Sequence, residues 1–466
     1  MNRSKKLYVL IGVFAVCCIV TFFVSQYEEK KEQIKNSDEV ILQINSEKVT
    51  ALSWEYASES LSFHKDEEWT YDEDKAFPVD GEKLEELLDV FEEFGVSFII
   101  EEVEDYGQYG LENPTCEIKI QEDEETYEIA VGDYSTMDSE RYISIGDGNV
   151  YLVSEDPMDT YEITLDDVML HDVFPNFNQV EQVTFKGDQK YEIHYVKNSK
   201  DTYCAEDVYF VEKDDRTLPL DTTKVTDYMD MIGGLDLTSY VTYNVTDEEL
   251  ATYGLDEPEL TISVQYSWED DETEETVTDT FTLSVAQEPE QAGTVMENSD
   301  EEEEIIAYAR VGESKIIYKL ASNQYENLLA ASYDDFRHKE VLTADFDDIK
   351  KIDIALEGET YTITAEKGEE EDELVYVYGT EEIDISSLQT AISSLEAYNF
   401  ATDAPSDKEE ISLTIYLNNE NFPTVEIELY RHDGEYCMAV VDGETFALVE
   451  RNEVVDLIEA VNEIVL

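Results

Sequence analysis

Positively charged residues are scarce in this 466-residue chain. It has 30 lysines and arginines against 114 aspartates and glutamates, which gives a formal net charge of −84. Nucleic-acid binding needs clustered basic side chains against the phosphates, so this balance excludes it as a function class. It also argues against a protein that lies flat on an anionic lipid surface. Because like charges repel in the compact state, we expect salt or weakly associated divalent cations to stabilise the fold without a dedicated metal site.

Cysteine and histidine, two frequent metal ligands, are also few. The five cysteines include no C-x-x-C pair, which excludes zinc ribbons and thioredoxin-like motifs, and we interpret them as small core residues. The five histidines stand singly, without H-x-x-x-H spacing, so the sequence does not support zinc catalysis. We interpret His171 and His338 as exposed or capping groups near the C-terminal end of a helix.

The motifs of several large enzyme classes are missing as well. The chain contains no G-x-S-x-G, no P-loop and no G-x-G-x-x-G after a predicted strand. The acidic runs at 301–304 and 369–372 lack the residue spacing of a calcium-binding loop. The sequence therefore predicts a protein that is not an enzyme, with no catalytic, cofactor-binding or metal-binding residues and no cofactor.

One long apolar run lies near the N-terminus. Arg3, Lys5 and Lys6 precede it, and its length is at the short end for crossing a bilayer. The positive charges before the run predict a cytoplasmic N-terminus, and the bulky residues after it give no A-x-A-like cleavage site. We predict a cytoplasmic tail at 1–6, a retained single-pass transmembrane helix at 7–25, a spacer at 26–38 and the bulk of the chain outside the cell. Cleavage of the run as a signal peptide is the alternative.

One short motif occurs twice, as Tyr-Gly-Leu-Glu-Asn-Pro at 109–114 and Tyr-Gly-Leu-Asp-Glu-Pro at 253–258. An alternating, strand-like segment follows each copy. Glycine can adopt positive φ, and proline cannot donate a hydrogen bond to a neighbouring strand, so both residues suit a turn that leads into a strand. Two widely separated copies of such a turn suggest a duplicated unit.

A second pattern occurs three times. Asp80, Asp221 and Asp384 each follow an apolar residue and precede apolar residues at helical spacing, with the same offsets in all three copies. Strand-like alternation surrounds each copy, and repetition in register indicates tandem duplication. The predicted fold class is α+β: an N-terminal transmembrane helix followed by three related modules, each a mostly antiparallel sheet with a packed helix. The modules are assigned to residues 39–176, to 177–343 with an acidic insertion near 269–304, and to 344–466 as a divergent copy.

These landmarks carry a resemblance to a known family. The Trp54-x-Tyr56 strand, the Pro-[Val/Leu]-Asp helix start, the Tyr-Gly-Leu-x-x-Pro turn and the strands around Gly132-Asp133 and Arg141-Tyr142 resemble bacterial proteins of domain-of-unknown-function (DUF) family 4340. The likeness covers roughly residues 50–340. It implies a membrane-anchored accessory component outside the cytoplasm, associated with ABC-type export systems of the gliding-motility kind, and it supplies no catalytic residues.

Two functional hypotheses remain. The first is a non-enzymatic, membrane-anchored scaffold or accessory subunit, with the membrane and an ABC transporter permease or related subunits as partners and no nucleic acid. The alternative is a cell-surface module that binds cell-wall glycan or divalent cations. The 31 tyrosines could form an aromatic sugar-binding face, although sheet packing alone explains tyrosines that alternate along strands.

Overall fold

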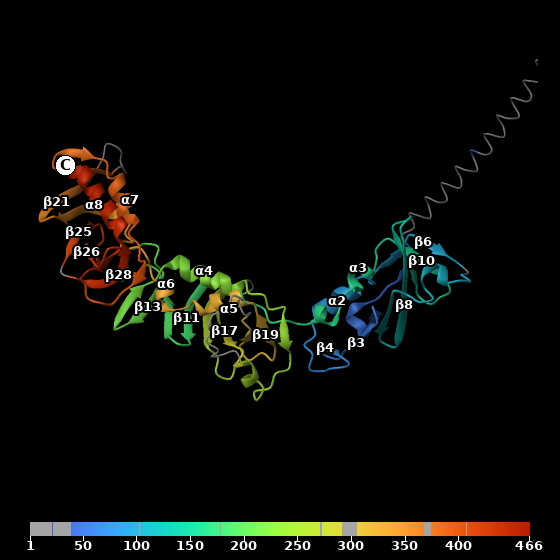
Figure 1. The fold of residues 1–466 in the computed structure, drawn as a ribbon. Helices are drawn as coiled ribbons and strands as arrows, with labels where there is room; N and C mark the ends of the chain where they lie inside the picture. Colours follow the sequence, from blue (N-terminus) through green and yellow to red (C-terminus); the bar gives the residue numbers. More distant parts are fainter. Residues whose placement is uncertain are drawn as a thin grey trace, which may run out of the picture. The chain divides into compact units, whose positions relative to one another are not determined.

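The computed structural model describes residues 21, 39–101, 103–177, 179–270, 273–290, 305–367, 374–406 and 408–466. The chain divides into two compact units, Met1–His171 and Asp172–Leu466. The first is coloured blue to cyan and the second green to red in Figure 1. Of the described residues, 43% lie in strands and 19% in helices.

This composition corrects the predicted fold class. The described residues form mostly antiparallel sheets, and the prediction of three helix-packed α+β modules behind a transmembrane helix is wrong. The apolar helical faces in the sequence are real but short. A nine-residue helix is about 13 Å long, whereas eight strands side by side span roughly 34 Å, so one such helix covers only part of a sheet.

The predicted membrane anchor and cell-membrane location are also corrected. Among the described residues, no helix combines the length and the apolar character that crossing a bilayer requires. The longest of these helices, α8 (Arg451–Val465), has 15 residues, whereas a spanning helix needs about 20. Apart from Thr21, the predicted anchor at 7–25 lies outside the described residues.

The first unit contains an eight-stranded antiparallel sheet in the order β4-β3-β2-β7-β8-β9-β10-β6, and β1 pairs separately with β5. The strands are β1 (Glu39–Leu42), β2 (Val49–Tyr56), β3 (Glu59–Lys65), β4 (Trp69–Tyr71), β5 (Phe94–Val96), β6 (Phe98–Ile100), β7 (Cys116–Glu122), β8 (Glu125–Ser135), β9 (Glu140–Ser144) and β10 (Val150–Val153). Trp54 stacks on Phe63 and meets the ring of Tyr161 edge-on. All three rings are buried and form part of the apolar core of the first unit.

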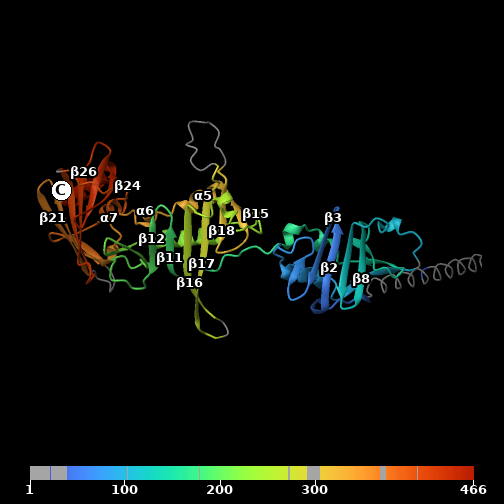
Figure 2. The same ribbon diagram turned by 90° about the horizontal axis from the view of Figure 1, so that it is seen from below.

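The second unit contains two nine-stranded sheets (Figure 2). We call them the second sheet, with the strand order β14-β13-β12-β11-β16-β17-β18-β19-β15, and the third sheet, with the strand order β23-β22-β21-β20-β25-β26-β27-β28-β24. The order is the same in both sheets when the strands are counted from β11 and from β20. The strands of the second sheet are β11 (Gln179–Lys186), β12 (Lys190–Tyr195), β13 (Tyr209–Lys213), β14 (Arg216–Pro219), β15 (Tyr240–Thr242), β16 (Leu260–Glu269), β17 (Thr276–Gln287), β18 (Ala307–Val311) and β19 (Ile317–Leu320). Those of the third sheet are β20 (Ile349–Leu356), β21 (Glu359–Lys367), β22 (Leu374–Tyr378), β23 (Glu381–Ile383), β24 (Asn399–Phe400), β25 (Glu409–Leu417), β26 (Thr424–Arg431), β27 (Tyr436–Val441) and β28 (Glu444–Glu450). The predicted acidic insertion begins in the β16–β17 hairpin, where Glu269 pairs with Thr276.

Besides α8, the described α-helices are α2 (Gly81–Asp89), α3 (Met158–Tyr161), α4 (Thr222–Gly233), α5 (Ser322–Leu329), α6 (Tyr333–Phe336) and α7 (Ser386–Ser393). Two of the three predicted N-caps are confirmed. The Asp80 side chain accepts a hydrogen bond from Lys83 N, and that of Asp221 accepts from Thr223 N and Lys224 N. The third start is displaced by one residue, because Ile385 is the N-cap of α7.

The repeated Tyr-Gly-Leu turn forms as predicted. Short 3₁₀ helices, η2 (Gly107–Tyr109) and η4 (Leu250–Tyr253), end at Gly110 and Gly254, whose φ angles are 72° and 69°. The strands β7 and β16 follow. In the first unit the turn packs tightly on β8, since a Cβ added to Gly132 would lie 2.3 Å from the Tyr109 carbonyl oxygen. Gly110 in the turn and Gly132 in β8 therefore allow the two backbones to approach each other closely.

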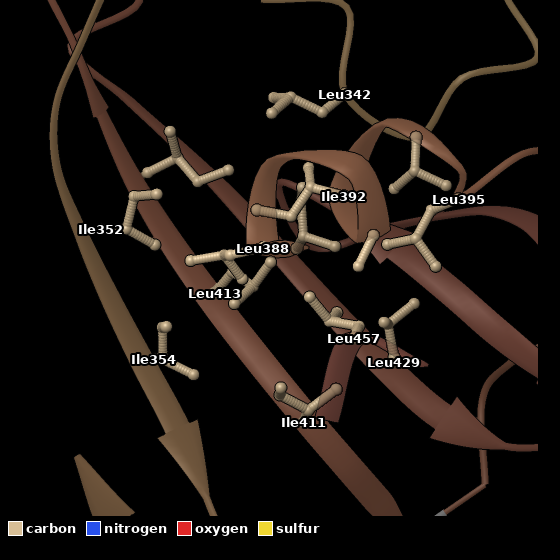
Figure 3. Packing of buried hydrophobic residues seen from close by; sticks show 14 of the residues in the cluster. Leu342, Ile352, Ile354, Leu388, Ile392, Leu395, Ile411, Leu413, Leu429 and Leu457 are labelled. Carbon is tan, nitrogen blue, oxygen red and sulfur yellow. The ribbon is translucent and has the colours of Figure 1, made fainter. Parts of the chain in front are cut away.

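A continuous apolar core lies on the third sheet (Figure 3). Leu388 and Ile392 of α7 and Leu457 of α8 are buried together with strand residues such as Ile352 and Leu413. The side chains interlock between the two helices and strands β20, β25 and β26 (Figure 3). This core holds α7 and α8 against the strands of the third sheet.

Candidate functional site

A cleft of about 650 Å³ lies within the second unit, between parts of the second and third sheets. Three segments line it: the β13–β14 hairpin with the loop before β13, the stretch from 333 to 343, and the ends of β27 and β28 with Phe422. Its lining residues are Asp201, Thr202, Tyr203, Asp215, Arg216, Thr217, Leu218, Pro219, Tyr333, Arg337, His338, Glu340, Val341, Thr343, Phe422, Val441, Asp442, Glu444 and Phe446. The lining is mixed, with aromatic, basic and acidic side chains. We call it the junction cleft.

An ion pair crosses the rim of the junction cleft. Arg216 Nη1 donates to Glu444 Oε1 at 2.6 Å, joining the β13–β14 hairpin to β28. The two side chains are 51% and 63% exposed. An exposed pair of this kind contributes little to stability, so a binding partner can replace either member at small cost.

Aromatic rings hold the basic groups on one side of the cleft. The Arg337 guanidinium carbon lies 3.9 Å from the ring centre of Phe400, 5.2 Å from that of Tyr333 and 5.4 Å from that of Phe446. Lys213 Nζ lies 4.2 Å from the Tyr333 ring centre. Cation–π attraction thus holds these two positively charged side chains beside the cleft. The same side chains cover ring faces on which a sugar could otherwise stack.

A histidine–carboxylate network borders the junction cleft. His338 Nε2 lies 2.8 Å from Asp207 Oδ1, and the Thr202 hydroxyl donates to Asp207 Oδ2 at 2.6 Å. The Asp207 side chain is 1% exposed and that of His338 is 19% exposed. Burial opposes protonation of His338, but the hydrogen bond and charge of Asp207, with Asp221 and Glu340 nearby, raise its pKa above the usual value.

Two more carboxylates approach the same imidazole. Glu340 Oε2 lies 3.8 Å from His338 Nδ1. Asp221, His338 and Glu340 each offer one ligand atom, and these atoms lie within 4.8 Å of one another. Lys224 Nζ lies 3.9 Å from Asp221 Oδ2 and donates to the Arg337 carbonyl oxygen at 2.6 Å. Burial lowers the pKa of Lys224, although Asp221 opposes that shift.

The structure corrects the interpretation of His338 as an exposed or capping group. The side chain is only 19% exposed, and its Nε2 lies 2.8 Å from Oδ1 of Asp207, a residue of the loop before β13 that is 131 positions away in sequence. No motif marks Asp207, so sequence reasoning missed it. The interpretation of the cysteines as core residues is confirmed for Cys116 and Cys437, which are buried free thiols, but Cys204 is only partly buried. Cys17 and Cys18 lie outside the described residues.

Comparison with known proteins shows which family the chain belongs to. The model of the family described as "Domain of unknown function (DUF4340)" matches residues 69–258 and 211–414. The chain belongs to this family. The first DUF4340 match begins in β4 and the second in β13, each shortly before a capping aspartate, Asp80 or Asp221. A search of curated proteins found no match to the chain.

Proposed function

We propose that the protein is a non-enzymatic scaffold or accessory subunit, and that the junction cleft holds a segment of a partner protein. One observation carries the proposal: an open cleft of about 650 Å³ whose rim presents Arg216 and Glu444 as an exposed, exchangeable ion pair. A partner segment with charges of both signs could take over each half of this pair. The well-packed core of the third sheet supports the rim on that side.

The chemistry of the lining favours a polypeptide over a glycan. Sugar rings bind by stacking on exposed aromatic faces, but Lys213 and Arg337 lie over Tyr333, and Arg337 lies over Phe446. The Tyr203 ring meets Phe422 edge-on at 5.6 Å. A peptide needs fewer free ring faces, because its amides and charged side chains can bind the polar groups of the rim.

The DUF4340 likeness suggests where the partner belongs. The resemblance noted in the sequence implies an association with ABC-type export systems of the gliding-motility kind, and we propose a subunit of such a system as the partner.

Site-specific photo-crosslinking in the cells that make the protein tests the proposal. A photoreactive amino acid at position 444, on the cleft rim, should give one defined adduct that contains an ABC transport component. The matched control is position 381, an exposed glutamate on β23 outside the cleft. Reversing the rim charge with Arg216→Glu should reduce the adduct at 444. Equal adducts at 444 and 381, or an adduct without a transport component, would count against the proposal.

A further inference from the structure

We propose that His338, Glu340 and Asp221 form a site for one divalent transition-metal ion of the zinc type. The site lies beside the junction cleft, which His338 and Glu340 also line. The inference goes beyond the proposed function, because metal binding at these side chains does not depend on a partner in the cleft.

The three donors are close to coordination distance. His338 Nδ1 and Glu340 Oε2 are 3.8 Å apart, and all three donor atoms lie within 4.8 Å of one another. A tetrahedral zinc ion with bonds of about 2.0–2.1 Å holds its ligands about 3.3 Å apart, so small side-chain rotations would close the site. One imidazole and two carboxylates are ligands that zinc accepts, with water in the fourth position.

Glu340 provides an independent sign of a ligand. Its Oε2 atom is buried and, within the described part of the chain, has no hydrogen-bond partner, although the Glu340 side chain as a whole is 44% exposed. A buried carboxylate oxygen without a donor is costly, because nothing replaces the water it has lost. A metal ion at this position would satisfy that oxygen.

The environment of the imidazole matches that of a metal-bound histidine. When His338 Nε2 carries the proton and donates to Asp207 Oδ1, the Nδ1 lone pair is free on the side of Glu340. Asp207 is itself fixed by the Thr202 hydroxyl. A carboxylate that accepts from the second ring nitrogen orients a histidine ligand and makes it more basic. Asp207 is therefore assigned as a positioning residue for the metal ligand.

Lys224 is the competitor for the site. Asp221 Oδ1 caps α4, which leaves Oδ2 as the donor, and Lys224 Nζ lies 3.9 Å from it. The ammonium already binds the Arg337 carbonyl oxygen. Its positive charge opposes a cation, so removing the charge should tighten metal binding.

Titration of the metal-free full chain with Co²⁺ tests the inference, because tetrahedral Co²⁺ with a histidine ligand gives intense visible absorption bands, whereas solvated, octahedral Co²⁺ held weakly by carboxylates absorbs only faintly. We expect one saturating site per chain, with Zn²⁺ displacing Co²⁺. His338→Gln should weaken binding at least about 100-fold, Glu340→Gln about 10-fold or more, and the positioning variant Asp207→Asn about 10–100-fold. Lys224→Met should strengthen it.

His432→Gln is the matched control, because His432 is exposed and lies outside the cluster. It should bind Co²⁺ as the wild type does. Circular dichroism and the melting temperature of each metal-free variant establish that it is folded, so that loss of binding is not loss of structure. Non-saturating binding, saturable binding that survives His338→Gln, or equal losses in His338→Gln and His432→Gln would overturn the site.

Discussion

Replacing Gly132 with alanine should specifically weaken the first unit. The added Cβ would lie 2.3 Å from the Tyr109 carbonyl oxygen and 2.9 Å from Leu111 Cγ. Normal carbon–oxygen contacts are about 1 Å longer, and the nearest atom belongs to backbone, which cannot rotate away. Overpacking of this kind costs about 1–3 kcal/mol, and we expect the upper end, about 3 kcal/mol. The melting temperature of this unit should fall by about 6–12 °C.

Gly95→Ala is the control. Gly95 lies in β5 of the same unit, and a Cβ added there would lie 4.0 Å from the Glu39 carbonyl oxygen, an ordinary van der Waals distance. Alanine should be neutral or stabilising by about 0.5–1 kcal/mol at this position. Calorimetry of the full chain gives the two melting temperatures, and hydrogen exchange of the β7 and β8 amides locates the weakened region. Equal melting temperatures for the two variants would refute the close-approach reasoning.

Three further predictions concern other buried groups. Arg141 binds Asp156 through two nitrogens, and the two side chains are only 15% and 12% exposed. Because Asp156→Ala would leave the buried Arg141 charge without its partner, the free energy of unfolding measured in urea should fall by about 3–5 kcal/mol. A fall below about 1 kcal/mol would contradict this. Burial raises the pKa of the Cys116 thiol to about 12, so thiol reagents at pH 8 should label it only on unfolding. Burial, with Glu450 and Glu396, raises the pKa of Glu453; because its charged form is disfavoured in the fold, Glu453→Gln should stabilise the second unit at pH 7. That gain should vanish as the pH falls below about 4.5, and exposed Glu459→Gln should show neither effect.

The sequence predicted local structure better than architecture. The capping roles of Asp80 and Asp221 and the left-handed Gly110 and Gly254 could be predicted because each depends on neighbouring residues. The fold class could not be predicted in the same way. Helical periodicity shows which residues form one face of a helix, but it does not show what fraction of a broad sheet that helix covers. The start of α7 was displaced by one residue at Asp384, although its side chain still accepts from Ser386 N.

The candidate site could not be predicted from sequence patterns. His338 and Asp207 are 131 positions apart, and Arg216 and Glu444 are 228 apart. Such pairs depend on how one sheet meets the next within the second unit, and no local spacing records that arrangement. The one available signal was the rarity of histidine and arginine in so acidic a chain.

The most direct test of the account is the photo-crosslinking comparison in the native cells. With the photoreactive group at 444, we expect a single adduct with an ABC transport component, reduced by Arg216→Glu and absent with the group at 381. Indistinguishable adducts from the rim and from β23, or an adduct at 444 that Arg216→Glu leaves unchanged, would contradict the junction cleft as the partner-binding surface.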